Sequence, residues 1–415
     1  MKESGFWRYE NRMIAILAIN FGFVFIDRNA FGYLAPFIGP DLGLNNTEIG
    51  AIVSALSFTW ALSGILLGGL AEAVGKRKAF LIVSVVVFSL CSVLSGIAGS
   101  FLMLMAARLI MGFSEGGIAP ISQSLVVLES SHERRGANMG IMQNSLSSLF
   151  GSFAAPLVLV AIANWLSWRD AFYLAAIPGM VMAFVIARYI REPTAREVEE
   201  AHRESEAPPP EQMSRLAMFK FRNMWLCVLI SCVMVCWMVL GWTFLPVFFT
   251  SRGVPASTMS YLVSVLGLAA AIWCFIVPGL SDKIGRKPVM IFFLAIGVIT
   301  PLGALYYHGS PWIIALLLFI GWAASGVFPM FMGTIPSETV PVAYFATAFG
   351  LTQGIGEMIG SVIGATAAGR AADVYGQAAP LWIMVGCAVV AAVFALFLKE
   401  TAPIKVGAVA VTEPA

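Results

Sequence analysis

Two eleven-residue stretches decide how the rest of the chain is organised. The first is Gly68-Gly-Leu-Ala-Glu-Ala-Val-Gly-Lys-Arg-Lys78, and the second is Pro278-Gly-Leu-Ser-Asp-Lys-Ile-Gly-Arg-Lys-Pro288, which follows at an offset of 210 residues. Glu72 of the first stretch matches Asp282 of the second. Each stretch follows a long apolar run and combines small residues, one carboxylate and a basic cluster. A repeat of this kind indicates a chain built from two related halves.

Apolar runs of bilayer-spanning length lie on both sides of each stretch. The 415 residues are 59% hydrophobic and only 12% charged, whereas soluble domains carry about 25% charged residues. The composition and pattern therefore predict an all-α integral membrane protein with twelve transmembrane helices in two pseudo-symmetric six-helix bundles. The expected spans are 13–36, 48–71, 79–99, 101–128, 137–163, 170–190, 223–249, 257–280, 288–307, 311–335, 343–369 and 377–398.

The polar break between the sixth and seventh spans sets the expected domains. Residues 1–190 form an N-terminal six-helix bundle, 191–222 a cytoplasmic linker, 223–398 a C-terminal six-helix bundle, and 399–415 a cytoplasmic tail. Basic residues outside the spans divide about twenty to three between the two sides of the membrane. The positive-inside rule then places both termini and the linker in the cytoplasm. We expect no cleavable signal peptide, because the polar start runs directly into a span.

The composition excludes several classes of function. No basic cluster exceeds a short loop, so we expect no nucleic-acid partner. The six cysteines all lie in apolar segments without disulfide or zinc-ligand spacing, so we expect no metal site. No nucleophile and base set is visible, which argues against an enzyme. The three histidines fall in connecting segments, so any proton carrier inside the membrane should be a carboxylate.

The repeated stretches resemble the G-x-L-x-D-x-x-G-R-[RK] signature of the major facilitator superfamily, which occurs after the second and eighth spans. This chain departs from the signature at Glu72 and at Pro278. The resemblance implies that small residues let helices approach and that the charged residues hold a cytoplasmic gate. The gating candidates are Gly68, Glu72, Gly75, Lys76, Arg77, Asp282, Gly285, Arg286 and Lys287.

Three further segments resemble the anion:cation symporter branch of that superfamily. They are Asp27-Arg28-Asn29, the R-x-x-x-G-x-x-E…P pattern of Arg108–Pro120, and Trp165–Tyr173 with Ile177-Pro-Gly179. The branch includes sugar-acid, hexuronate and phthalate-type carriers. The resemblance implies proton-coupled uptake of a small organic carboxylate. The short loops between the spans favour a bacterial inner-membrane protein. The resemblance also implies a monomer in membrane lipid, with the proton as coupling ion and no other cofactor.

Four charged residues lie inside spans of the N-terminal half: Asp27, Arg28, Arg108 and Glu115. Each such charge costs about 2.5–3.5 kcal/mol at a helix centre, so the chain must gain something from them. Arg108 and Glu115 are seven residues apart and project from nearly the same helix face. At the 210-residue offset, the positions of Asp27, Arg108 and Glu115 are occupied in the second half by uncharged residues: Trp237, Leu318 and Ser325.

The four charges sum to zero when all are ionised. Protonating one carboxylate leaves one arginine without a partner, and a carboxylate substrate would restore neutrality. We therefore assign the proton to Glu115 or Asp27, the anion to Arg28, and to Arg108 the roles of internal partner of Glu115 and substrate contact. The alternatives are a structural ion pair between Arg108 and Glu115, and a packing pair formed by Asp27 and Arg28.

Polar and aromatic residues of other spans are candidates for the substrate pocket. They are Tyr33, Trp60, Gln143, Asn144, Ser147, Trp237, Trp242, Phe331, Gln353 and Glu357. The tryptophans and tyrosine could instead mark the membrane interface. Glu357 stands beside a glycine stripe and could either line the pocket or gate, or pair structurally.

Two other functions remain open from the sequence. An organic-anion or drug/proton antiporter of the same fold would drive efflux, although the segment Gly151–Pro156 does not match the motif expected of drug antiporters. A membrane sensor or transceptor is a second alternative. It would require a cytoplasmic signalling domain, which the short linker and tail do not offer.

Overall fold

The computed structural model describes residues 9–130, 138–139, 141–142, 147–194, 219–340 and 345–406, without the side chains of Ile65, Glu72, Phe345 and Ala346. The described chain is almost entirely helical. It separates into two compact units. Unit 1 comprises Met1–Leu44 and Ala55–Ala207, and unit 2 comprises Asn45–Ser54 and Pro208–Ala415.

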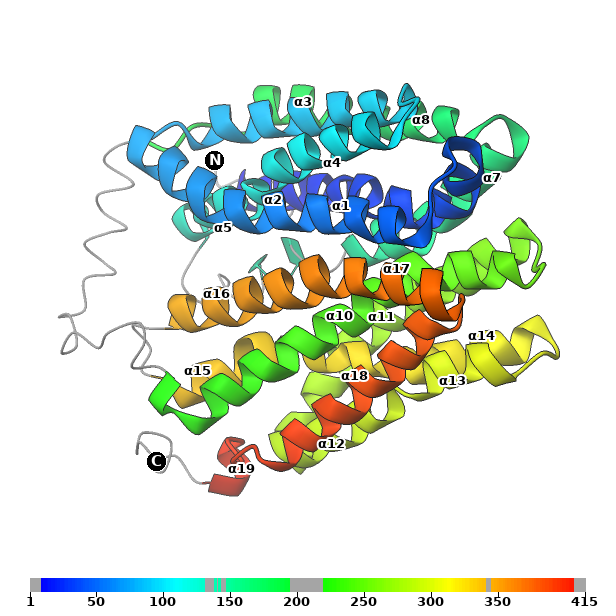
Figure 1. The fold of residues 1–415 in the computed structure, drawn as a ribbon. Helices are drawn as coiled ribbons and strands as arrows, with labels where there is room; N and C mark the ends of the chain where they lie inside the picture. Colours follow the sequence, from blue (N-terminus) through cyan, green and yellow to red (C-terminus); the bar gives the residue numbers. More distant parts are fainter. Residues whose placement is uncertain are drawn as a thin grey trace. The chain divides into compact units, whose positions relative to one another are not determined.

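Unit 1 is built from long helices that pack along one another (Figure 1). Its helices are α1 (Tyr9–Leu42), α2 (Asn46–Val74), α3 (Arg77–Gly96), α4 (Phe101–Gly116), α5 (Ile118–Glu129), η3 (Ser147–Ala154), α7 (Ala155–Trp165) and α8 (Trp168–Tyr189). The first turns of α2 are grouped with unit 2. Serine side chains cap two of these helices: Ser100 accepts from the Met103 N–H, and Ser167 accepts from the Asp170 N–H.

The interior of unit 1 forms where α3 packs against α4 and α8, and where α1 packs against η3 and α8. Its core is dominated by aliphatic and aromatic side chains such as Leu17, Phe21, Leu81, Phe88 and Met111. Glycines at the end of α4 bring that helix close to α2. A Cβ atom on Gly116 would lie 2.1 Å from the main-chain oxygen of Trp60, so only glycine permits this approach.

Unit 2 repeats the arrangement with more interrupted helices. Its elements are α10 (Arg222–Ser251), α11 (Ala256–Ile284), α12 (Arg286–Ile296), α13 (Ile299–Tyr306), α14 (Pro311–Gly321), η5 (Trp322–Val327), η6 (Met330–Thr334), α15 (Ile335–Thr339), α16 (Phe345–Gly356), η8 (Glu357–Ile363), α17 (Gly364–Tyr375), α18 (Ala379–Leu396) and α19 (Pro403–Val406). The pairing of α10 with η8 corresponds to that of α1 with η3. The pairing of α12 with α18 corresponds to that of α3 with α8.

Eleven helices of the described chain are long and apolar enough to cross a membrane. The span expected at 343–369 falls on the helical run α16, η8 and α17, which is not among the eleven. Its glycines, Gln353 and Glu357 make it less apolar than the others. Both η3 (Ser147–Ala154) and η8 (Glu357–Ile363) are π-helical. Such segments are rare and often lie at functional sites.

Candidate functional site

The Asp27 carboxylate is buried inside unit 1, on α1. Its Oδ1 atom accepts a hydrogen bond from the Ser92 hydroxyl of α3, at 2.6 Å. Its Oδ2 atom has no hydrogen-bond partner among the described residues. Ser92 was not singled out from the sequence, where it is one of several serines in an apolar span. Asp27 therefore keeps one oxygen available inside the bundle.

Arg108 of α4 is held by a carbonyl and two aromatic rings. Its Nη1 donates to the main-chain oxygen of Asp27 at 3.1 Å. Its guanidinium carbon lies 5.0 Å from the ring centre of Phe172 and 5.6 Å from that of Phe31. The side chain is only 1% exposed, and Nε and Nη2 have no hydrogen-bond partner in the described part of the chain. A buried guanidinium with open donors suits an anion or a mobile carboxylate.

Glu115 lies at the far end of the same helix and is also 1% exposed. Neither carboxyl oxygen has a hydrogen-bond partner among the described residues. The direct ion pair expected with Arg108 is not formed, because seven residues of helix separate the two by about 10 Å along the axis. The charges that act on Glu115 are those of Arg28, Asp27 and Arg108. The four residues thus form one electrostatic cluster, although Arg108 and Glu115 are not in contact.

Arg28 is the more accessible of the two arginines, since it is half-buried whereas Arg108 is buried. Its guanidinium carbon lies 4.5 Å from the ring centre of Trp60 on α2. Stacking on a tryptophan face orients the planar guanidinium. Trp60 itself is placed by the close approach of α4 to α2 at Gly116. Arg28 and Trp60 therefore combine a charged and an aromatic surface.

The structure places the other pocket candidates of the N-terminal half differently. Tyr33 is wholly buried, and its hydroxyl donates to the main-chain oxygen of Gly151 at 3.0 Å. This bond ties α1 to η3, where Ser147 is also buried. Gln143 and Asn144 lie outside the described residues.

In unit 2 the counterpart of Asp27, Trp237, belongs to an aromatic cluster. The ring centres of Trp237 and Trp322 are 4.5 Å apart, and Trp242 meets Trp322 edge-on at 5.0 Å. Trp237 and Trp322 are wholly buried, and their indole nitrogens have no acceptor among the described residues. Ser325, the counterpart of Glu115, is buried without a partner for its hydroxyl within the same residues. Trp322 was not singled out from the sequence.

The remaining candidates of unit 2 lie on three elements. Phe331 is wholly buried in η6 and packs on Phe328, with ring centres 4.9 Å apart. Gln353 is half-buried on α16. Glu357 is buried at the start of η8, at the residue where the helix changes to π geometry. Phe331 therefore contributes to the core, and the role of Glu357 stays a prediction.

The second repeated stretch forms a dense charge network. Arg286, the first residue of α12, bonds to Glu338 at 2.7 Å and also to Asp282 and Ser281. The Glu400 carboxylate accepts from the main-chain N–H groups of Arg286 and Lys287, at 2.7 and 3.2 Å. A carboxylate at a helix N-terminus satisfies donors that the helix itself leaves open. Gly285 precedes this helix with φ of +118°.

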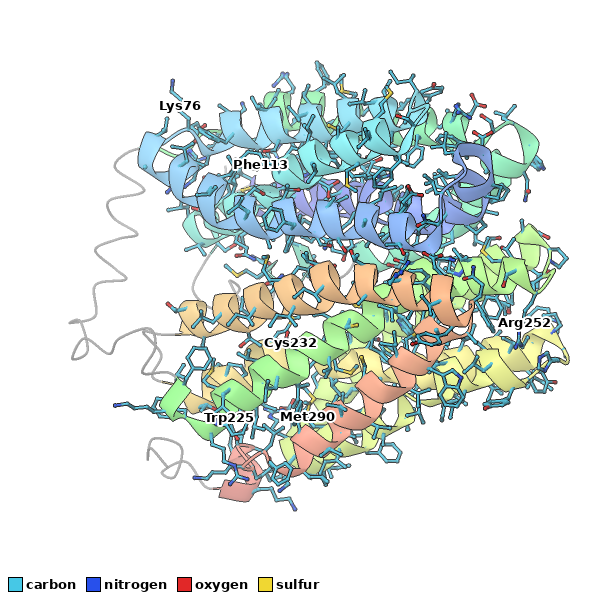
Figure 2. All side chains as sticks on the ribbon, viewed as in Figure 1. Lys76, Phe113, Trp225, Cys232, Arg252 and Met290 are labelled. Atoms are coloured by element: carbon cyan, nitrogen blue, oxygen red, sulfur yellow. The ribbon has the colours of Figure 1, made fainter. Side chains whose placement is uncertain are left out.

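The described side chains of the first stretch make a different set of contacts. Arg77 donates to Ser124 at 2.8 Å, and Glu192 accepts from the Lys78 N–H at 3.0 Å. Gly75 has φ of +69°, and Gly68 lies against the ring of Pro120. Lys76 is exposed and extends away from the bundle (Figure 2). The side chain of Glu72 lies outside the described residues.

Glu192 and Glu400 were missed from the sequence, although a signal exists. Each follows a basic residue directly after the last span of its half, in Arg191-Glu-Pro193 and Lys399-Glu-Thr-Ala-Pro403. Glu192 accepts from the N–H of Lys78 in the first turn of α3, and Glu400 from those of Arg286 and Lys287 in the first turn of α12.

The family model described as Major Facilitator Superfamily matches residues 17–364 and 279–413. The chain belongs to the Major Facilitator Superfamily. The fold agrees with this assignment, since the chain superposes on a variant of nucleoside transporter NupG with a TM-score of 0.77 at 15% identity. That superposition covers 93% of this chain and 100% of the other.

Curated relatives are more informative about the branch. A probable 4-methylmuconolactone transporter of Cupriavidus pinatubonensis is 27% identical over 81% of this chain and 79% of its own length. A gentisate transporter of Corynebacterium glutamicum is 25% identical over 86% of this chain and 81% of its own length. These relatives are consistent with the anion:cation symporter branch. The chain is a multi-span membrane transporter and not an enzyme.

Proposed function

We propose that this transporter takes up a small organic carboxylate together with a proton, by alternating access between its two halves. The observation that carries the proposal is the Arg28, Asp27, Arg108 and Glu115 cluster, in which two buried carboxyl groups and a buried guanidinium keep open hydrogen-bonding atoms among the described residues. Charged side chains that serve only a structural role inside a membrane normally have their hydrogen-bonding atoms paired with one another or with backbone carbonyls. The names of the relatives support an organic acid as substrate.

The roles follow from charge balance. With all four groups ionised the cluster is neutral, and a proton on Glu115 leaves it with one positive charge in excess. An incoming carboxylate restores neutrality, and Arg28 is the candidate ligand because it is the more accessible arginine. Two states thus avoid an uncompensated charge: the empty carrier with Glu115 ionised and the loaded carrier with Glu115 protonated. If only these two states can change between the outward-open and inward-open conformations, the flux of the carboxylate is coupled to the flux of the proton.

The environment of the site supports a ring-bearing or sugar-derived acid. Trp60 offers a flat face beside Arg28, and gentisate is the substrate in the name of one relative. The proton is the only coupling ion that we propose. We place the protein in the bacterial inner membrane as a monomer, with both termini in the cytoplasm, on the basis of the charge distribution of its loops.

Proteoliposomes test the proposal directly. Wild-type protein should accumulate gentisate or glucuronate when the outside is made acidic. Glu115→Gln should lose this accumulation and retain counterflow exchange of the same acid at equal pH, because exchange requires no net proton release. Glu48→Gln, a carboxylate at an exposed helix start, should behave as wild type. Accumulation by Glu115→Gln at the wild-type rate would contradict the coupling role, and uptake driven only by the reversed gradient would indicate an antiporter.

A further inference from the structure

In unit 1, the buried polar side-chain atoms without a partner form a regular series. Within the described residues they belong to Asn20 and Asp27 on α1, and to Arg108, Glu115 and Ser122 on α4 and α5. The residues of each group are spaced by seven. Seven residues are two helical turns, so each group lies along one face of its helix. Gly117 between α4 and α5 keeps helical backbone angles, so the alignment continues from Glu115 to Ser122.

One hydrogen bond fixes the register of the two series. Arg108 donates to the main-chain oxygen of Asp27, which places these residues at the same depth. The first and fourth spans run in opposite directions, and α1 packs against both α4 and α5. We follow each helix for two turns from the level of Asp27 and Arg108 toward the side of the loop stretch Gly68–Lys78. This leads to Asn20 on α1 and to Glu115 on α4. Asn20 and Glu115 lie at one level, and Ser122 lies two turns further on.

Asn20 and Ser122 are buried, and their side-chain polar atoms have no hydrogen-bond partner among the described residues. The two side chains are 0% and 1% exposed. The core residues next to them in sequence, Phe21, Ile121 and Leu125 among them, are apolar. Buried polar groups in folded proteins are paired with protein atoms or with ordered water. An amide and a hydroxyl each offer a donor and an acceptor. A water molecule in a hydrogen-bonded row of waters needs both kinds of partner.

The series ends at a carboxylate that can reach solvent. Seven residues after Ser122 comes Glu129, at the end of α5. Its carboxylate forms an ion pair with Arg191 at 2.7 Å, and its side chain is 11% exposed. The positive-inside rule places this end of the bundle at the cytoplasm. A path of two-turn steps thus runs from Glu115 past Ser122 to Glu129.

We propose that Asn20 and Ser122 hold water that conducts the proton from Glu115 to Glu129 and the cytoplasm. The proposal rests on the proposed function, because it supplies the release route for the coupled proton. Glu115 gives one proton to the adjacent water, each water passes one proton onward, and one proton leaves at Glu129, so no water is consumed. The carboxylate that remains faces Arg28 and Asp27 of α1, Arg108 of its own helix and the Cys91 thiol of α3. Proton release thus takes place inside one bundle.

The test compares acid-driven accumulation of gentisate or glucuronate with counterflow of the same acid in proteoliposomes. Asn20→Leu and Ser122→Ala should each slow accumulation by about tenfold or more, and should change counterflow by less than about twofold. Asn20→Ser should keep accumulation, because a hydroxyl can hold the same water. The matched control is Ser114→Ala, a buried serine whose hydroxyl is already bonded to the Met111 carbonyl at 2.8 Å; it should leave both assays unchanged.

Each outcome is decisive. Wild-type accumulation by both Asn20→Leu and Ser122→Ala overturns the path, and so does an equal loss of accumulation and counterflow in Ser122→Ala, which indicates a packing role. If Asn20→Leu does not fold, Ser122→Ala decides alone, because it removes a single oxygen. Glu115→Gln separates the two proposals. Normal accumulation by Glu115→Gln removes the coupling itself, whereas a defect there with normal Asn20→Leu and Ser122→Ala removes only the path.

Discussion

The two units place very different residues at equivalent positions of the same helix arrangement. Unit 1 has Asp27, Arg108 and Glu115 where unit 2 has Trp237, Leu318 and Ser325. Corresponding helix pairings surround both sets, since α1 packs on η3 as α10 packs on η8. The fold therefore does not require charges at these positions. Their presence in one unit alone is what the proposed coupling role predicts.

The interiors of the two units are filled by different kinds of side chain. Unit 2 fills its centre with Trp237 and Trp322, whose tilted rings have centres 4.5 Å apart and bury large apolar surfaces. Unit 1 places the Arg108 guanidinium against Phe31 and Phe172, and the Nε and Nη2 atoms of Arg108 have no hydrogen-bond partner among the described residues. A packed aromatic core resists rearrangement, whereas a cluster with open hydrogen-bonding atoms can exchange partners. We therefore expect substitutions in the centre of unit 2 to affect stability most, and substitutions in the proposed coupling cluster of unit 1 to affect transport most.

A crossed pair of substitutions gives the largest expected effect. Trp322→Ala should lower the free energy of unfolding by about 3–5 kcal/mol, because it leaves a cavity beside Trp237. Arg108→Met should lower stability less than Trp322→Ala does, because a nearby carboxyl group, Asp27 or Glu115, can take up a proton when the arginine charge is removed. For transport we expect the larger loss from Arg108→Met, because losing one partner of a buried charge pair costs about 2–5 kcal/mol, which slows uptake by about 30-fold or more.

Thermal unfolding of the purified proteins and uptake by proteoliposomes measure the two properties. Trp237→Phe serves as a control that keeps an aromatic ring. It should retain most of the thermal stability and most of the uptake rate. If Arg108→Met unfolded at a much lower temperature than Trp322→Ala, the cluster would be a structural device, and the contrast between the units would disappear.

Arg28→Lys tests a smaller effect within unit 1. Lysine keeps the charge and loses the planar fork that can bind a carboxylate through two bonds. The KM for gentisate or glucuronate should rise by about tenfold, which corresponds to about 1.4 kcal/mol. Arg169→Lys is a matched control, because Arg169 also stacks on a tryptophan, with its guanidinium carbon 4.1 Å from the ring centre of Trp168. An unchanged KM in Arg28→Lys would remove the ligand role.

The sequence predicts much of the fold because membrane spans and repeated loops leave strong patterns. Apolar length predicted the spans, and the family motifs predicted the transporter fold that the comparisons show. The sequence did not predict the segments where helices change geometry. The π-helical turns at Ser147 and Glu357 depend on backbone packing that residue types do not reveal.

The site was predictable in its charges and not in its contacts. A charged residue within an apolar run stands out at once, as Asp27 and Arg108 do. Ser92 and Asn20 do not, because small polar residues are common in membrane helices, and only the structure shows that Ser92 bonds to Asp27. The pairing of Arg108 with Glu115 was expected from their shared face, but two turns of helix keep their ends apart.

The smallest expected effect concerns the ends of the two bundles, where the repeated stretches differ. Arg286 bonds to two carboxylates, those of Glu338 and Asp282, whereas Arg77 bonds to the Ser124 hydroxyl. Arg286→Ala should lower the unfolding temperature more than Arg77→Ala does. A bond to a charged group contributes about 1.5–3 kcal/mol, against about 0.5–1.5 kcal/mol for a neutral one.

The difference can be measured by thermal unfolding in detergent at low and high salt. Salt should reduce the effect of Arg286→Ala, since part of its network is exposed, and should leave that of Arg77→Ala unchanged. Equal effects in the two variants would show that the second stretch holds its helices by shape, and that its charges matter only for gating.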